Sequence, residues 1–255
     1  MIKDPLLDIT NLNVNLKEKK ILINLNLKIK KGETHVLMGP NGAGKSTLAN
    51  ILTGNFKDYD VTGSITYNKI NLFSLSQEDI ALKGLFLSFQ NPIEIPGLSN
   101  LQFFKSFINN KRKHQNLDPI DHVELLNIIE KKMKTLKIKN EFINRSVNEN
   151  FSGGEKKRNE ILQMLLLDPN LIILDEIDSG LDIDSIKHVF DAINCFKNKN
   201  NSFLIITHYT KITDYTNIDK IHILYDGTII KTGQTDITIE LEKNGYSNKK
   251  NIKII

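Results

Sequence analysis

A glycine-rich segment at residues 39–46 (GPNGAGKS) constrains this chain more than any other feature of its sequence. It matches the pattern G-x-x-x-x-G-K-[ST] at every fixed position, follows an apolar run at residues 35–38 and precedes a helical pattern that ends near Gly54. Glycines let the backbone curl until its N–H groups face phosphate oxygens, and a helix N-terminus adds a positive field. The segment therefore predicts a phosphate-binding loop within a strand–loop–helix unit.

Two side chains of this loop carry its chemistry. We expect the ammonium group of Lys45 to bind the β- and γ-phosphates of a nucleotide, and the hydroxyl of Ser46 to ligate Mg²⁺. The residues expected to contact the nucleotide here are Gly39, Pro40, Asn41, Gly42, Ala43, Gly44, Lys45, Ser46 and Thr47.

An apolar run at residues 171–174 ends in two carboxylates, Asp175 and Glu176. In an open α/β sheet the carboxyl end of such a strand lies beside the phosphate loop. We expect Asp175 to hold Mg²⁺, through water, and Glu176 to orient and polarise the attacking water. Taken alone, the pair could equally be a solvated strand end, but the phosphate loop upstream favours the catalytic interpretation.

A second glycine-rich helix start follows at Ser152. Ser152 and Glu155 have the spacing of a capping box, so one interpretation is a simple helix N-cap. Such a helix start is also an anion site. A second phosphate site in a chain with one nucleotide loop is explained if it binds the γ-phosphate held by another protomer.

Strand and helix patterns alternate along most of the chain, which predicts an α/β fold with a mainly parallel sheet. Residues 99–147 differ, because helical spacing dominates there and predicts a helical subdomain. We also expect a hairpin or other β-element around Gly63, an exposed loop at residues 111–116 and a hairpin at Asp226–Gly227.

Composition excludes several classes of protein. The single cysteine, Cys195, excludes a disulfide framework or a four-cysteine metal site within one chain. The sequence contains no run of 18 apolar residues, so we expect no transmembrane helix. The start of the chain matches neither a signal nor a transit peptide. We therefore expect a cytoplasmic location, or the plastid stroma for an organelle-encoded chain, without direct membrane insertion.

Lysines at 131, 132, 134, 137 and 139 form a basic stretch. It could mark a nucleic-acid ATPase, but a solvated helix is favoured because no aromatic residues interleave with the lysines for base stacking. We expect no nucleic-acid partner.

The order of these motifs resembles that of the ATP-binding cassette ATPases over nearly the whole chain. After the phosphate loop come Gln90, the segment 151–155 (FSGGE), the acidic pair, the segment 179–182 (SGLD) and His208. The resemblance implies ATP and Mg²⁺ as cofactors and a cassette fold with a mostly parallel core sheet, an antiparallel β subdomain and an inserted helical subdomain. Residues 1–255 would form one domain, with a nucleotide-binding core at 1–90 and 160–255 and the helical subdomain at approximately 91–159.

The same resemblance implies roles for single residues. Gln90 would bind the nucleotide and ligate and sense its Mg²⁺, and it would couple to partners. Asp182 would contact the nucleotide and lie at a dimer interface, and His208 would join Glu176 as a catalytic residue by contacting the γ-phosphate. The residues implied to bind the ATP of an opposing protomer are Ser152, Gly153, Gly154 and Glu155. Their position implies a transient, ATP-dependent, head-to-tail homodimer.

Longer stretches resemble one branch of these ATPases, the SufC family. They are residues 91–100 (NPIEIPGLSN), 145–148, 151–163 (FSGGEKKRNEILQ), 178–184 and 207–209. The resemblance implies a role in iron–sulfur cluster assembly with SufB-like and SufD-like scaffold partners, and it assigns residues 94–99 to scaffold docking. The alternative is the cytoplasmic ATPase of a membrane transporter. Because no aromatic residue between Val14 and Ile23 is present to stack on adenine, we expect the base to rest on apolar groups such as Val14 or Ile21.

Overall fold

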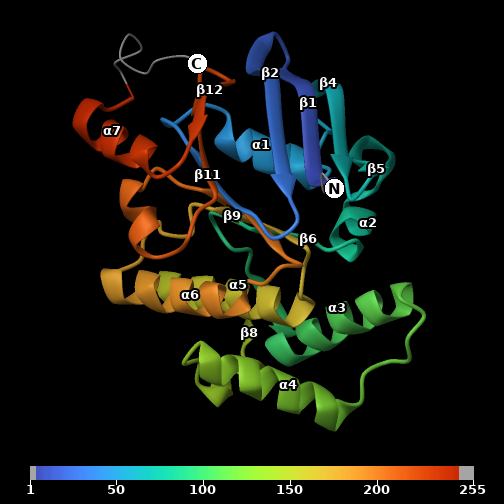
Figure 1. Cartoon of the computed structure of the whole chain (residues 1–255). Coiled ribbons are helices and arrows are strands. Elements are labelled where there is room, and N and C mark those ends of the chain that lie inside the picture. Colours follow the sequence, from blue (N-terminus) through green and yellow to red (C-terminus); the bar gives the residue numbers. More distant parts are fainter. Residues whose placement is uncertain (1–3, 247–255) are drawn as a thin grey trace. The chain divides into compact units, whose positions relative to one another are not determined.

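The structure is a computed structural model that describes residues 4–246. The chain divides into two compact units (Figure 1). The first unit comprises Met1–Leu87, Asn170–Glu176 and Lys197–Ile255, and the second comprises Ser88–Pro169 and Ile177–Phe196. The first unit is therefore built from three segments that are distant in sequence.

An antiparallel sheet of four strands opens the first unit (Figure 1). In the order β2-β1-β4-β5, its strands are β2 (Lys19–Lys30), β1 (Pro5–Leu16), β4 (Asp60–Tyr67) and β5 (Ile70–Asn71). The alternating apolar residues of β2 between Leu25 and Ile29 are buried and their neighbours exposed, as the period of two predicts.

The hairpin or β-element predicted around Gly63 is confirmed as the antiparallel pair β4–β5, although Gly63 itself is not the turn. Gly63 lies inside β4, and the chain reverses at Asn68 and Lys69, whose φ angles of 48° and 68° suit a tight hairpin turn. Gly63 has a φ of 103°, and a Cβ there would lie 2.4 Å from the carbonyl oxygen of Asn11. This glycine therefore lets β4 pass an irregularity in the pairing of β1 instead of forming a turn.

The second sheet of the first unit has six strands and is mostly parallel, as predicted. In the order β12-β11-β3-β10-β9-β6, they are β12 (Thr228–Gly233), β11 (Lys220–Tyr225), β3 (Thr34–Met38), β10 (Ser202–Ile206), β9 (Leu171–Asp175) and β6 (Leu85–Ser88). Strands β11, β3, β10 and β9 pair in parallel, and β11 and β12 form the antiparallel hairpin predicted at Asp226–Gly227.

Helix α1 (Lys45–Leu52) connects the two sheets through the core. Its Leu48 and Leu52 are fully buried in one apolar cluster with Leu7 of β1 and Ile173 of β9. Burying one such side chain stabilises the fold by about 1.5–3 kcal/mol. The other helical segments of this unit are α2 (Gln77–Leu82), α7 (Asp236–Asn244) and the short η1 (Leu72–Ser74) and η3 (Thr210–Asp214).

The second unit is mainly helical, as predicted for residues 99–147. Its helices are α3 (Asn100–His114), α4 (His122–Thr135), η2 (Asn140–Asn144), α5 (Gly153–Leu167) and α6 (Ile183–Phe196). It also contains a short strand pair, β7 (Ile95–Ser99) and β8 (Ser146–Val147).

The prediction of an exposed loop at residues 111–116 is wrong for the first four of these residues, because they form the last turn of α3. Lys111 explains the difference. Its ammonium group donates to the carbonyl oxygens of Leu167 and Asp168, and so ties this part of α3 to the end of α5.

The compact units are bounded differently from the expected subdivision into core and helical subdomain. Residues 177–196 belong to the second unit because α6 packs on α5, although the sequence placed them with the core. The single-domain organisation stays a prediction. Within residues 4–246 no helix combines the length and the apolar character needed to cross a membrane.

Candidate functional site

Three neighbouring strands of the parallel sheet end at one edge of the first unit and carry most of the predicted site. Strand β3 leads into the phosphate loop, β9 ends at Asp175 and precedes Glu176, and β10 leads to Thr207 and His208. The carboxyl ends of parallel strands are where open α/β sheets bind ligands. The fold thus gathers the predicted catalytic residues of this unit.

The phosphate loop is shaped by Gly44, which precedes α1. Gly44 has a φ of 106°, which strains any residue with a side chain, and a Cβ there would lie 3.0 Å from the carbonyl oxygen of Ile21. No side chain caps the start of α1. Its first backbone N–H groups are therefore available to an anion, and the helix dipole favours negative charge at this point.

Lys45 is held inside this loop with only 5% of its surface exposed. Its ammonium group donates to the carbonyl oxygens of Gly39, at 2.8 Å, and Pro40, at 3.0 Å. Burial lowers the pKa of Lys45, whereas the charges of Glu176 and Asp175 raise it. The electrostatic coupling indicates that this lysine and the two carboxylates share one site.

Glu176 has an unusual backbone for a residue with a side chain. Its φ is 47°, in the left-handed region that most residues avoid, and its N–H donates to the carbonyl oxygen of Ile206 at 2.9 Å. Its Oε1 lies 3.9 Å from Nδ1 of His208, whose side chain is 56% exposed against 12% for that of Glu176. The two predicted catalytic residues are thus adjacent, with the imidazole open to solvent.

The oxygen donors predicted for Mg²⁺ belong to elements that pack together. Ser46 is exposed in the first turn of α1, Asp175 ends β9 with 6% of its surface exposed, and α1 packs on β9. A hydroxyl and a carboxylate are hard oxygen ligands of the kind Mg²⁺ takes alongside water and phosphate. The residues present therefore fit this ion.

The second unit holds the other predicted nucleotide contacts. Ser152 is the N-cap of α5, and the predicted capping box is confirmed: the N–H of Glu155 donates to Ser152 Oγ at 3.3 Å, and the N–H of Ser152 donates to Glu155 Oε2 at 2.8 Å. Ser152 and Gly153 are exposed at this helix start, and Gly154 is partly exposed. The surface of the helix start is open to a ligand from outside the unit.

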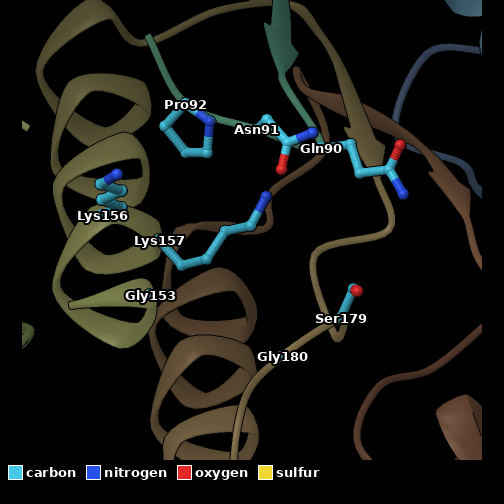
Figure 2. Close-up of a pocket in the computed structure, with 8 residues that line it drawn as sticks. All are labelled: Gln90, Asn91, Pro92, Gly153, Lys156, Lys157, Ser179 and Gly180. Atoms are coloured by element: carbon cyan, nitrogen blue, oxygen red, sulfur yellow. The ribbon is translucent and has the colours of Figure 1, made fainter. Parts of the chain in front are cut away.

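A cavity of about 320 Å³ brings Gln90 together with this helix start (Figure 2). Its lining includes Gly153 of α5 and Ser179 and Gly180 of the SGLD segment. Figure 2 shows the Lys157 side chain reaching from α5 toward the segment that carries Gln90 and Asn91. Three motifs that are far apart in sequence therefore surround one space.

Asp182, which is predicted to lie at a dimer interface, caps a helix of its own unit. Its carboxylate accepts from the N–H of Ser185, at 2.8 Å, and from the Ser185 hydroxyl, at 3.0 Å, and thereby caps the start of α6. These hydrogen bonds lower the pKa of Asp182. A contact across a dimer interface stays a prediction for this residue.

Sequence reasoning missed a buried ion pair on α5. Lys157 and Glu160 are 3% and 4% exposed and lie 3.4 Å apart. The Lys157 ammonium donates to the Phe89 carbonyl at 2.6 Å, while Glu160 accepts from the Phe89 N–H at 3.0 Å and from the Ser88 hydroxyl at 2.8 Å. Burial raises the pKa of Glu160, and the charge of Lys157 opposes that shift. The pair fixes the backbone that immediately precedes Gln90.

The expectation that adenine rests on Val14 is wrong. Val14 is fully buried in the apolar cluster and has no surface to offer a base. Ile21 is only partly buried and remains a candidate. Leu16 and Ile23, which are 37% and 39% exposed, add apolar surface in the same stretch of chain.

The fold and the phosphate loop define an ATP-hydrolysing enzyme of the cassette class. The chain belongs to the ABC transporter family, whose model matches residues 22–179.

Within this family, the predicted resemblance to SufC-type ATPases is confirmed by several relatives. The chain is 48% identical to a probable ATP-dependent transporter of Synechocystis sp. over 94% of both chains. It is 46% identical to the probable ATP-dependent transporter SufC of Escherichia coli, covering 94% of this chain and 97% of that one. It is 44% identical to ABC transporter I family member 6, chloroplastic, of Arabidopsis thaliana, covering 95% of this chain and 72% of that one.

Solved structures confirm the fold class. A nucleotide-free ATP-binding cassette from an ABC transporter matches with a TM-score of 0.76 and 26% identity over 98% of both chains. A dimeric ATP-binding cassette bound to ADP and Pi matches with a TM-score of 0.77, covering 90% of this chain and 98% of that one. At 22% identity, the second likeness concerns the fold alone.

Proposed function

We propose that this chain is the ATPase subunit that drives conformational change of a SufB/SufD-type scaffold in iron–sulfur cluster assembly. The observation that carries the proposal is the 46% identity to SufC of Escherichia coli over nearly the full length of both chains. Such similarity extends far beyond the nucleotide motifs that all cassette ATPases share.

The geometry of the first unit supports a hydrolytic mechanism. ATP binds with its phosphates against the start of α1 and the ammonium group of Lys45. Glu176 orients and polarises the attacking water, and His208, 3.9 Å from its carboxylate, contacts the γ-phosphate. Mg²⁺, held by Ser46, Asp175 and Gln90, would neutralise charge on the phosphates.

The exposed start of α5 supports an ATP-bridged, head-to-tail homodimer. Ser152, Gly153, Gly154 and Glu155 of one protomer bind the γ-phosphate of ATP held by the phosphate loop of the other, with Asp182 at the interface. ATP binding closes the dimer and hydrolysis lets it open, because the bridging ligand has differential affinity for the two states.

Scaffold docking is assigned to residues 94–99. These residues include all of β7, which pairs with β8. Ile93, just before them, is 64% exposed, and Glu94 forms an ion pair with Lys156 of α5 at 2.6 Å. An exposed apolar side chain beside a strand that is tied to α5 suits a surface that transmits movement to a partner.

We place this activity in the bacterial cytoplasm or the plastid stroma, without nucleic-acid partners or direct membrane insertion. The Arabidopsis relative is named as chloroplastic, which supports the plastid stroma as one of the two locations.

Co-purification tests the proposal. The chain would be tagged, expressed with its genomic neighbours and recovered with and without ATP, with a Lys45→Ala variant as the control for nucleotide dependence. Soluble SufB-like and SufD-like proteins in the eluate are the expected result.

The second candidate is the cytoplasmic ATPase of a membrane transporter. Two of the relatives are named probable ATP-dependent transporters, which favours this candidate. Recovery of a polytopic membrane protein in the same experiment would replace the cluster-assembly proposal with this one and leave the ATPase assignment intact.

A further inference from the structure

Arg145 stands out in a chain that uses lysine at 31 of its 34 basic positions. It lies immediately before β8, the strand that pairs with β7. Its guanidinium carbon lies 4.2 Å from the ring centre of Phe151 and 4.7 Å from that of Phe142. These two rings pack edge to face with their centres 4.8 Å apart. A planar guanidinium can stack on aromatic faces and still donate hydrogen bonds from its edge, which a lysine ammonium cannot do.

The edge of this guanidinium contacts the turn at the start of α5, which we call the signature turn (residues 150–155). One nitrogen donates to the carbonyl oxygen of Asn150 at 3.2 Å, and another lies 4.0 Å from Glu155 Oε1. Glu155 is the carboxylate that completes the capping box with Ser152. Arg145 therefore contacts the chain on both sides of Ser152, and its charge offsets a carboxylate in a turn proposed to bind phosphate.

The backbone of Arg145 is fixed to the other side of the strand pair. Its carbonyl oxygen accepts from the N–H of Asn100, at 2.9 Å, and from the side-chain amide of Asn100, at 3.2 Å. Asn100 follows β7 directly and is 1% exposed. Its amide oxygen in turn accepts from Asn159 of α5 at 3.0 Å.

Asn148 closes this network on the far side of β8. Its side-chain nitrogen donates to the Ile93 carbonyl at 2.8 Å, and its amide oxygen accepts from Asn159 at 2.9 Å. Buried amides that satisfy one another in this way hold a single arrangement, because breaking any bond leaves an unsatisfied group. The strands β7 and β8 and the helix α5 thus share one polar core, and Arg145 extends it to the signature turn.

We propose that Arg145 is a positioning residue that holds the signature turn in register with the strand pair β7–β8. Movement of that strand pair is transmitted to Ser152 and Glu155 through the guanidinium group. The inference deepens the proposed function and rests on it for the assignment of β7 to scaffold docking.

The test replaces Arg145 with lysine in a Glu176→Gln background, and the matched control is Arg112→Lys. Arg112 donates through Nε to the Asp118 carbonyl at 2.6 Å, at the end of α3. Hydrogen exchange of the nucleotide-free full chain is measured at the amides of residues 150–156. We expect exchange about tenfold faster with Arg145→Lys, equivalent to roughly 1.4 kcal/mol, and unchanged with Arg112→Lys. Equal exchange in the two variants would overturn the inference.

A second readout separates positioning from a loss of stability. MgATP-driven dimerisation should need about tenfold more ATP with Arg145→Lys, the same free-energy difference expressed as a ratio of affinities, while ATP binding to the dilute monomer stays unchanged. Loss of monomer binding would indicate general unfolding and contradict the inference. If the parent Glu176→Gln protein itself stays monomeric with MgATP, the proposed head-to-tail dimer fails, and the exchange measurement still decides the role of Arg145.

Discussion

Two helices of this chain begin at glycine-rich turns expected to meet phosphate, and they begin differently. Helix α1 in the first unit follows Gly44, and no side chain caps it. Helix α5 in the second unit follows Ser152, and the N–H groups of Ser152 and Glu155 are engaged in a reciprocal capping box. One helix start leaves its donors for a ligand, whereas the other has already satisfied part of them.

The difference indicates that the two helix starts differ in their affinity for phosphate. The start of α1, with the buried Lys45 beside it, can bind phosphate without help from another molecule. At the start of α5, the N–H groups of Ser152 and Glu155 already have acceptors, and the Glu155 carboxylate adds negative charge beside an anion. We therefore expect the first site to bind ATP on its own, and the second to contribute only when a protomer presents an ATP that is already bound.

Removing the catalytic carboxylate should produce the largest effect on the first site. Glu176→Gln should lower turnover by at least about 100-fold, because an amide cannot accept a proton from water, while ATP binding is retained. Phosphate release and calorimetric ATP binding measure the two properties. Glu130→Gln, on the exposed face of α4, is the control and should hydrolyse ATP normally. Normal turnover of Glu176→Gln would show that another group activates the water.

Removing Lys45 from the phosphate loop should reduce the affinity of the first unit for ATP. Lys45→Ala should weaken ATP binding by about 100-fold, since hydrogen bonds from a charged donor contribute about 1.5–3 kcal/mol. The matched control is Lys111→Ala, because Lys111 in the second unit also donates to backbone carbonyls and burial also lowers its pKa. The control should lower thermal stability but not ATP affinity. Equal loss of affinity in both variants would contradict a specific role for Lys45.

Acid should weaken the first unit before the second. His222 is 4% exposed and shares a 2.9 Å hydrogen bond with His35, and burial lowers its pKa to about 3, with the charges of His35 and Lys220 adding to the shift. The folded pKa is below the unfolded value of about 6.5, so stability is present above pH 6.5 and is lost as pH falls toward 3. The loss is about 1.4 kcal/mol per pH unit in this window.

Glu160 of the second unit has the opposite effect on stability as pH falls. Burial raises its pKa, so protonation removes a buried charge and favours the folded state. Thermal unfolding between pH 7 and pH 5 measures the net effect of the two groups on stability, and the His222→Gln variant is the control. The variant should show a flatter dependence on pH than the unmodified chain. An identical slope would mean that His222 does not govern acid stability.

The smallest effect is expected at the capped helix start. Ser152→Ala should lower the free energy of unfolding by about 1 kcal/mol, the usual effect of losing an N-cap. Ser76→Ala removes the equivalent cap of α2, which has its own capping box with Asp79, and should lower stability by a similar amount. Only Ser152→Ala should also reduce turnover. If both variants hydrolyse ATP at the unmodified rate, Ser152 is a cap and nothing more.

The parts of the site that could be predicted from the sequence are those formed by residues close to one another along the chain. The phosphate loop, the strand that ends in Asp175 and the capping box at Ser152 each depend on residues within a few positions of one another. Their geometry follows from backbone rules that act over a single turn or strand. The structure accordingly places each of them on the expected type of element.

The errors and omissions concern residues whose role depends on distant partners. The β-element around Gly63 was predicted, but the role of Gly63 was not, because its positive φ serves the neighbouring irregularity in β1. Val14 was expected at the base because it is apolar, but the core buries it completely. Lys157 and Arg145 act on segments that the sequence does not mark as neighbours. Tertiary contact, rather than local pattern, decides all four positions.

The central strand β3 has a consequence for how the protein is made. Both of its hydrogen-bonded neighbours, β10 (Ser202–Ile206) and β11 (Lys220–Tyr225), are synthesised long after it. A chain emerging from the ribosome therefore carries β3 and the phosphate loop without the sheet that supports them, and such long-range parallel pairing is slow to form. The helices of the second unit between residues 100 and 167 are complete before β10 emerges. The sheet around the phosphate loop therefore cannot be completed until β11 has been synthesised.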